Sequence, residues 1–190
     1  MKKLSLIAAV LLCLTAVAAA QDVKPIDIYI GGGVSIPNAP EGFKDGFKMG
    51  YHGMGGIEAK AFTGFSLLFL ADYNRFSPDV EGIDGGEISL LSFTLNAKLG
   101  LGVPAAPLKP YFFGGVGLAN TSVSDIDASE PDDITVFTME SKTDACFGVG
   151  AGLEFKAGPS AAIFVQGRYM IIATEGDALS YFPITVGFKF

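Results

Sequence analysis

The sequence is poor in the residues that build common catalytic and metal sites. It contains no tryptophan, a single histidine, His52, and two cysteines, of which only Cys146 lies beyond the first 20 residues. One cysteine cannot form an intramolecular disulfide, so no disulfide is expected to stabilise the folded chain. No metal-ligand cluster, phosphate-binding loop or nucleophile elbow is present. We therefore expect neither a metal nor a cofactor.

Basic residues are also scarce. Thirteen lysines and arginines stand against 20 aspartates and glutamates, which gives a net charge of −7. Removal of an amino-terminal segment that contains Lys2 and Lys3 takes this charge from −7 to −9. Nucleic-acid binding depends on lysine and arginine contacts with phosphates, so the composition argues against a nucleic-acid partner.

The amino terminus has the pattern of a secretory signal peptide. Two lysines precede an apolar run over residues 4–17, and Ala18-Ala-Ala20 then precedes polar Gln21. A charged start, a short apolar run and a small-residue cleavage site define such a peptide, and the run is too short to cross a membrane as a helix. We expect a signal peptide over residues 1–20, cleavage between Ala20 and Gln21, and one folded domain over residues 21–190.

Long hydrophobic runs are missing from the rest of the chain, although the mean hydropathy is positive, at +0.43. No second apolar run approaches the roughly 18 residues that a membrane helix requires. Eight segments instead alternate between apolar and polar residues over about 9 to 14 residues, the length of tilted membrane strands. They lie near residues 26–36, 50–61, 65–74, 91–101, 110–119, 146–156, 163–171 and 182–190.

The connections between these segments alternate in length. Those after the first, third and fifth segments are long and polar, whereas those after the second, fourth and sixth are mostly shorter. Outer-membrane barrels have short periplasmic turns, longer external loops and, when the strand number is even, both termini in the periplasm. The sequence therefore predicts an all-β protein, an eight-stranded antiparallel up-and-down transmembrane β-barrel with periplasmic termini.

The apolar faces of the segments carry more large side chains than the interior of an eight-stranded barrel can hold. The opposite faces are rich in glycine, which makes room in a crowded lumen, so we expect the apolar faces to point outward. Charged residues share the glycine-rich face, and a lysine or arginine facing lipid at the midplane would cost roughly 2 to 4 kcal/mol. The charges predicted for the lumen are Lys60, Lys156, Lys189 and a central ion-pair network of Glu58, Lys98, Glu154 and Arg168. This network either closes the interior or lines a polar path for small solutes.

The last segment ends on an aromatic residue. Its apolar face consists of Ile184, Val186, Phe188 and Phe190. The segment resembles the closing strand of bacterial outer-membrane barrels. The resemblance implies that the barrel-assembly machinery recognises these four residues as a signal.

Three motifs rich in glycine and aromatic residues carry a wider resemblance. They are Lys109-Pro-Tyr-Phe-Phe-Gly-Gly-Val-Gly-Leu-Ala119, Phe147-Gly-Val-Gly-Ala-Gly-Leu-Glu-Phe155 and Gln166-Gly-Arg-Tyr169. The sequence resembles the outer membrane protein beta-barrel domain family, the small opacity-type and OmpA-like eight-stranded barrels. The resemblance implies a bacterial outer-membrane location, contact with membrane lipid and lipopolysaccharide, and a role as an envelope stabiliser, adhesin, surface-evasion protein or narrow pore. Because the sequence stops at Phe190, an appended peptidoglycan-binding domain is not expected.

His52 raises the question of catalysis. Some eight-stranded outer-membrane barrels are lipid A deacylases or acyltransferases that use histidine and serine. The deacylases have a His-x-Ser arrangement at a lipid-facing strand end, whereas this sequence has His52-Gly-Met54 with His52 predicted to point inward. A hydroxyl nucleophile needs a base within hydrogen-bond reach, and the sequence indicates none. We expect an ordinary polar histidine in the lumen or at its rim.

The connection near residues 121–144 is strongly acidic. Its carboxylates are Asp125, Asp127, Glu130, Asp132, Asp133, Glu140 and Asp144. An EF-hand is not indicated, because Glu130 and Val136 stand where that loop requires glycine and glutamate. We expect a solvated acidic surface, or carboxylates that share divalent ions with lipopolysaccharide phosphates.

Aromatic residues are predicted near both ends of the strands, as in the interfacial girdles of membrane barrels. Near the outer ends these are Tyr51, Tyr73, Phe76 and Phe182, and near the inner ends Phe62, Tyr111, Phe155 and Phe190.

Together these patterns predict a non-enzymatic integral outer-membrane protein that supports the envelope or binds a surface ligand through acidic external loops. A narrow pore for small solutes or ions is the first alternative. A lipid A-modifying enzyme and a soluble periplasmic barrel follow it.

Overall fold

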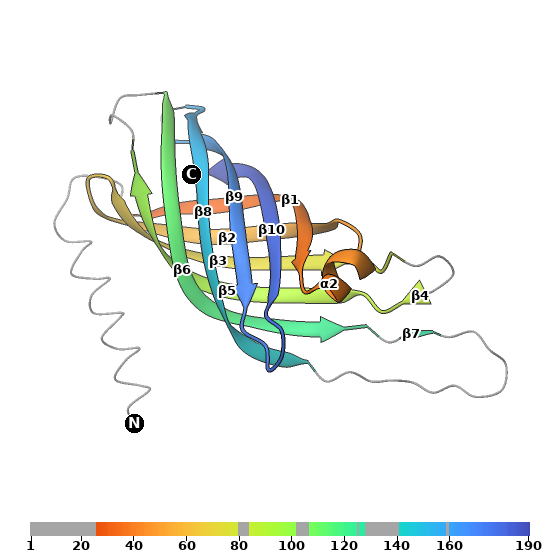
Figure 1. The fold of residues 1–190 in the computed structure, drawn as a ribbon. Helices are drawn as coiled ribbons and strands as arrows, with labels where there is room; N and C mark the ends of the chain where they lie inside the picture. Colours follow the sequence, from red (N-terminus) through yellow and green to blue (C-terminus); the bar gives the residue numbers. More distant parts are fainter. Residues whose placement is uncertain (1–25, 80–83, 102–106, 125, 128–140, 159) are drawn as a thin grey trace, which may run out of the picture.

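The computed structural model describes residues 26–79, 84–101, 107–124, 126–127, 141–158 and 160–190 (Figure 1). The proposed signal peptide and its cleavage site at Ala20 and Gln21 lie outside the described residues. The same holds for most carboxylates of the acidic connection, namely Asp125, Glu130, Asp132, Asp133 and Glu140.

Eight long strands form one closed barrel (Figure 1). They are β1 (Ile26–Ala39), β2 (Gly50–Phe62), β3 (Phe65–Phe76), β5 (Ile88–Gly100), β6 (Leu108–Val123), β8 (Lys142–Lys156), β9 (Ala162–Ile172) and β10 (Leu179–Lys189). Their order around the barrel is β1-β10-β9-β8-β6-β5-β3-β2, and all neighbours are antiparallel. The predicted eight-stranded antiparallel up-and-down barrel is confirmed. Two short strands, β4 (Asp84–Gly85) and β7 (Ile126–Asp127), form a separate two-stranded sheet.

The last strand closes the barrel against the first. Tyr29 is the register partner of Lys189, and the backbone groups of Ile28 and Phe190 exchange two hydrogen bonds of 3.0 Å. Strand pairing therefore continues as far as Phe190. In a membrane, such closure satisfies the backbone N–H and C=O groups that lipid cannot.

The two ends of the barrel differ in their connections. The turn end is defined by the connections at residues 63–64, 101–107 and 157–161. The loop end is defined by those at residues 40–49, 77–87, 124–141 and 173–178. Strand β1 begins and strand β10 ends at the turn end, so both ends of the barrel chain lie on the side with the mostly shorter connections.

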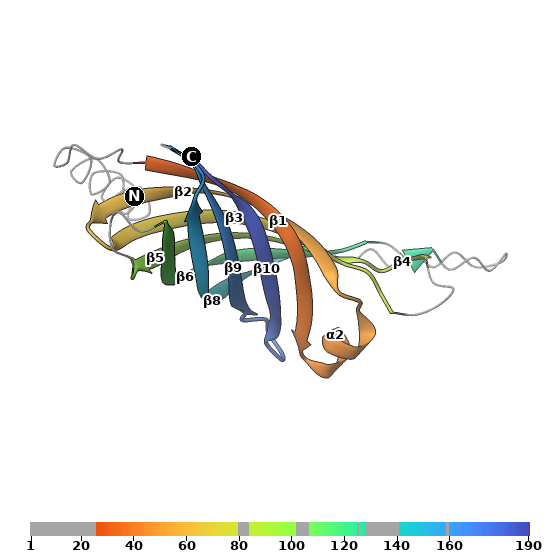
Figure 2. The same cartoon turned by 90° about the horizontal axis from the view of Figure 1, so that it is seen from above.

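A short helix, α2 (Glu41–Gly46), lies in the connection from β1 to β2, where the sequence predicted only a polar loop. Glu41 in its first turn and Lys44 in its last suit the helix dipole. Figure 2 shows the helix beyond the ends of β1 and β2. In the described part of the chain, no helix is long and apolar enough to cross a membrane, a result that does not concern strands.

The outer face of the barrel is an apolar belt. Ile30, Phe112 and Val186 are 58%, 54% and 54% exposed. Because side chains alternate across a strand, their chain neighbours Tyr29 and Phe113 are buried in the lumen. The structure thus agrees with the predicted outward orientation of the apolar faces.

The aromatic residues divide between belt and lumen. Those exposed on the outside are Tyr51, Phe62, Tyr73, Phe155, Phe182 and Phe190. Phe76 and Tyr111 are buried instead, so their predicted place in the girdles is wrong. Both lie at lumen-facing positions of their strands, and proximity to a strand end did not distinguish the two faces.

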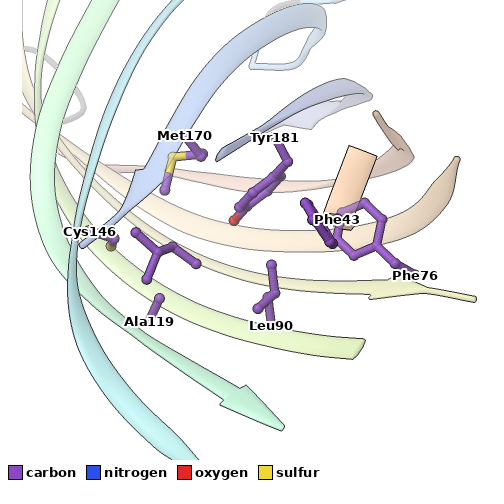
Figure 3. Packing of buried hydrophobic residues seen from close by; sticks show 8 residues of the cluster. Phe43, Phe76, Leu90, Ala119, Cys146, Met170 and Tyr181 are labelled. Carbon is purple, nitrogen blue, oxygen red and sulfur yellow. The ribbon is translucent and has the colours of Figure 1, made fainter. Parts of the chain in front are cut away.

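Side chains fill the lumen in layers. A central apolar layer contains Tyr29, Met54, Leu68, Leu70, Tyr111, Phe113 and Phe164. A loop-end apolar cluster contains Phe43, Phe76, Leu90, Ala119, Cys146, Met170, Ile172 and Tyr181 (Figure 3). Glycine makes room for the rings, since a Cβ added at Gly152 would lie 2.4 Å from Cζ of Tyr111.

Candidate functional site in the barrel lumen

A group of charged residues crosses the lumen near the turn end. Nζ of Lys98 lies 3.0 Å from Oε2 of Glu58 and also contacts Oε1 of Glu154. Lys189 reaches the same carboxylates, at 2.6 Å from Glu154 and 3.5 Å from Glu58. The hydroxyl of Tyr29 lies 2.6 Å from Glu58 and 2.7 Å from Glu154. These five residues, named the charge cluster below, come from strands β1, β2, β5, β8 and β10.

The charge cluster is balanced, with two lysines facing two glutamates. Nζ of Lys98 also lies 4.4 Å from the ring centroid of Tyr111, in a cation–π contact. Desolvation opposes the attraction within a buried ion pair, so a balanced cluster adds little net stability. Loss of one member is costly, however, because it leaves a buried charge without compensation. The charge cluster therefore links five strands of the barrel wall through contacts inside the lumen.

Arg168, the fourth residue predicted for the network, belongs to a different layer. Its Nη2 lies 2.8 Å from Oδ1 of Asp72, and both side chains are 2% exposed. Along β9, Arg168 lies four residues beyond Phe164, a span of about 13 Å in a strand. The ring of Phe164 packs against Tyr29 of the charge cluster at 5.1 Å. The structure thus brings the other three predicted residues together and pairs Arg168 with Asp72.

Two further lysines that the sequence places on the inward face of their strands, Lys60 and Lys156, lie at the turn-end rim of the barrel. Nζ of Lys60 lies 2.9 Å from Oδ2 of Asp27. Lys156 is exposed, so its predicted place in the lumen is wrong. It is the last residue of β8, where the barrel wall ends.

His52 lies inside the lumen, in a hydrogen-bonded group that the sequence did not indicate. Its Nδ1 lies 3.1 Å from Oγ of Ser35, and its Nε2 lies 2.9 Å from Oγ1 of Thr185. Oγ of Ser35 donates to Oδ1 of Asn74 at 2.6 Å. Which ring nitrogen of His52 donates and which accepts depends on the tautomer of the ring. The side chains of His52 and Ser35 are both buried.

Three aromatic rings, named the aromatic lid below, pack together at the loop end. Phe43 from helix α2 packs edge-on against Phe76 at 5.0 Å between ring centroids, and Phe76 packs against Tyr181 at 5.8 Å (Figure 3). Phe43 is 5% exposed. Sequence reasoning missed this residue, although Phe43 and Phe47 are spaced by four residues and their rings lie 5.6 Å apart. That spacing, behind Pro40, is the pattern that would have indicated an apolar helix face.

The described residues offer no evident metal site. Among them, no group of three or more histidine, cysteine, aspartate or glutamate side chains is placed to hold a metal ion.

A closed antiparallel barrel with an apolar outer belt and a filled, charged interior defines a small integral outer-membrane protein. Residues 6–190 match the family described as the outer membrane protein beta-barrel domain, and the chain belongs to that family. Its environment is accordingly the bacterial outer membrane, with lipid and lipopolysaccharide around the barrel. No curated protein matches the sequence.

Solved structures resemble the chain in fold. Neisserial surface protein A is 14% identical, with a TM-score of 0.64, over 87% of this chain and 96% of that chain. Ail, the attachment invasion locus protein of Yersinia pestis, is 16% identical, with a TM-score of 0.50, over 88% and 100% of the two chains. The N-terminal barrel domain of Pseudomonas aeruginosa OprF is 17% identical, with a TM-score of 0.48, over 87% and 96%. At these identities the likeness concerns the fold alone.

Proposed function

We propose that the protein is a non-enzymatic integral outer-membrane protein whose barrel is closed and whose loop end makes its interactions, in envelope structure or at the cell surface. The observation that carries this proposal is the filling of the lumen at two levels. The charge cluster occupies it near the turn end, and Phe43, Phe76 and Tyr181 pack across it at the loop end. The loops at this end are therefore the surface that we assign to the proposed interactions.

The proposed orientation places the turn end in the periplasm. Support comes from the even number of barrel strands and from the position of Ile26 and Lys189, both at the turn end. A cleaved signal peptide over residues 1–20 and a barrel domain over residues 21–190 fit this route of export.

The barrel-assembly machinery is a proposed partner. Its proposed recognition surface consists of Ile184, Val186 and Phe188 on β10 and of Phe190, which directly follows this strand. All four side chains are exposed on the outer face, and the rings of Phe188 and Phe190 stack at 6.3 Å between centroids. Recognition of this strand would bring the assembly machinery to the seam between β1 and β10.

The proposed surface partner is cationic, or is joined to the protein through divalent cations shared with lipopolysaccharide phosphates. This part of the proposal rests on the acidic sequence of residues 125–140. The described loop-end charges are partly paired, as in Lys48 with Asp79 at 3.5 Å and Lys142 with Glu175 at 3.0 Å. The name of the Yersinia pestis neighbour, an attachment and invasion protein, belongs to that protein and adds no argument at 16% identity.

The test is conductance of the refolded protein in a planar lipid bilayer. We expect wild-type protein to be silent, and a Phe43→Ala/Lys98→Ala double variant, altered in the lid and in the charge cluster, to show current steps. A Lys44→Ala/Lys48→Ala variant is the matched control and is expected to stay silent, because both side chains are exposed at the loop end. Reproducible steps from wild-type protein would contradict the closed-barrel proposal.

A narrow pore is the second candidate, and one observation favours it. Nε and Nη1 of Arg168 and Oδ2 of Asp72 are buried without a hydrogen-bond partner among the described residues. Buried polar atoms usually find a partner, commonly water. A path for solutes would use such polar atoms of Arg168 and Asp72 between the apolar layers. Conductance by wild-type protein that changes in an Arg168→Met variant would support a pore function.

A further inference from the structure

A vestibule opens at the turn end of the barrel. Two adjoining cavities of about 270 Å³ and 340 Å³ share Lys60, Lys109, Glu154 and Lys189 in their walls, and together they are named the vestibule below. The first cavity reaches inward to Lys98 and the charge cluster. The second extends to the connection between β8 and β9. Cavities of this size suit a small ligand.

The vestibule is positively charged in an acidic protein. Its walls contain the lysines Lys60, Lys98, Lys109, Lys156 and Lys189 and the carboxylates Asp27, Glu58 and Glu154. Five lysines against three carboxylates leave a surplus of two positive side-chain charges, whereas the whole chain carries −7. A recess lined by an excess of one charge concentrates the potential and attracts ions of the opposite sign.

The lysines differ in how far their charge is already compensated. Lys98 and Lys189 bind the glutamates of the charge cluster, and Lys60 pairs with Asp27. Among the described residues, the side chains of Lys109 and Lys156 have no ion-pair or hydrogen-bond partner. The positive surplus of the vestibule therefore resides mainly on these two ammonium groups.

The two uncompensated lysines face the same space from neighbouring strands. Lys109 on β6 is the register partner of Glu154 on β8. Lys156 lies two residues beyond Glu154, on the same face of β8. Both lysines line the second cavity. Their ammonium groups can thus bind one ligand together, by charge-assisted hydrogen bonds.

We propose that the vestibule binds a small soluble anion with phosphate or carboxylate groups, and that Lys109 and Lys156 are its principal ligands. A soluble ligand is favoured over a lipid headgroup because Glu58, Lys98 and Glu154 lie in the lumen, whereas lipid covers the outer faces of the strands. The ligand enters along the barrel axis and displaces none of the bonds within the charge cluster. This site is separate from the loop end, so its loss leaves the proposed surface function intact.

The test is isothermal titration of pyrophosphate into the full refolded barrel in nanodiscs of zwitterionic lipid. We expect wild-type protein to bind, with an affinity that falls as salt is added. A Lys109→Gln/Lys156→Gln variant is expected to bind about tenfold more weakly or less, the consequence of losing charge-assisted contacts. The matched control is Lys48→Gln/Lys142→Gln, which removes the same charge at the loop end and is expected to bind as wild type does.

Each variant has assembled if it keeps the gel mobility of the folded protein. Absence of wild-type binding at millimolar pyrophosphate, or equal affinities for the vestibule variant and wild type, would overturn the proposal. A further arm replaces the lipid with phosphatidylglycerol. If pyrophosphate does not bind but the anionic lipid associates in a manner that depends on Lys109 and Lys156, the ligand is a headgroup and the soluble-anion assignment is wrong.

Discussion

Lys98 on β5 and Glu58 on β2 form an ion pair of 3.0 Å between strands that are not neighbours in the barrel. Strand β3 lies between them along the wall, and both side chains are buried. The contact therefore passes through the lumen and not along a strand ladder. Bonds of this kind join strands that are not neighbours in the wall and contribute to the filling of the interior.

Lys98→Met should destabilise the barrel by about 3 to 5 kcal/mol, because the glutamates that it bridges lose a buried counter-charge. Equilibrium unfolding by guanidinium in lipid vesicles measures the change. Lys48→Met is the control, since the ion pair of Lys48 with Asp79 is exposed and worth about 0 to 1 kcal/mol. Adding Glu154→Gln to Lys98→Met restores the charge balance and should recover much of the loss. A Lys98→Met midpoint equal to that of wild type would refute this account of the cluster.

Gly152→Ala should destabilise the barrel by about 1 to 3 kcal/mol, the usual cost of overpacking. The added Cβ would lie 2.4 Å from Cζ of Tyr111, in the filled lumen. Gly176→Ala is the control, because a Cβ there meets nothing within 4 Å. The same unfolding assay compares the two, and equal midpoints for both variants would be incompatible with a tightly filled lumen.

Phe43→Ala should free helix α2 without opening the barrel wall. The ring of Phe43 is the helix's buried contact with the loop-end apolar cluster, and a helix of six residues has little stability of its own. Hydrogen exchange should accelerate at the amides of Phe43 and Lys44, which bond to the carbonyl of Pro40. The strand amides should stay protected. Lys44→Ala, on the exposed side, should change little; unchanged exchange in Phe43→Ala would show that the lid is held by other contacts.

His52→Ala should leave the protein without any change in lipid chemistry. His52 is hydrogen-bonded to Ser35 and buried in the lumen, away from the lipid, so neither wild-type protein nor the variant is expected to release fatty acid from lipopolysaccharide. Mass spectrometry of lipid A after incubation measures this. Fatty-acid release by wild type that is abolished in His52→Ala would restore the enzyme hypothesis.

The pair of Arg75 and Glu87 should respond to acid at the loop end. The hydrogen bond from Arg75 lowers the pKa of the Glu87 carboxyl, which lies outside the barrel strands. A carboxyl with a lowered folded-state pKa stabilises the folded state above its ordinary pKa of about 4.3, and that contribution is lost as pH falls through the folded-state pKa. Loop-end hydrogen exchange, corrected for intrinsic rates, should therefore increase below about pH 4 in wild type. The Glu87→Gln variant should lack this increase in exchange at low pH. If the increase is still seen in that variant, a group other than Glu87 causes it.

The parts of the fold that depend on local pattern were predictable. Alternation along the segments from Ile26 to Phe190 indicated which side chains face outward, and connection lengths indicated two unlike barrel ends. The exceptions have local causes as well. Lys156 lies at the end of β8, where a periodic pattern does not show how far the barrel wall extends. Phe76 and Tyr111 were placed in the girdles by their nearness to a strand end, although both lie at lumen-facing positions.

The candidate site was predictable only in part. The inward orientation of Glu58, Lys98, Glu154 and Arg168 follows from their position in the alternation. Their partners do not, because strand tilt and stagger in a closed barrel decide which inward residues meet. Asp72 could not be matched to Arg168 without that geometry, and Phe43 came from a connection that carried no strand pattern.

The sequence by itself determined the strands, their inward and outward faces and the family resemblance, because a period of two residues is a local property of the chain. Only the tertiary structure decided that Lys98 and Lys189 bind Glu58 and Glu154, that Arg168 binds Asp72, and that Phe43 covers the loop end. Each of these contacts joins residues far apart in sequence, and the tilt and closure of the barrel bring them within bonding distance.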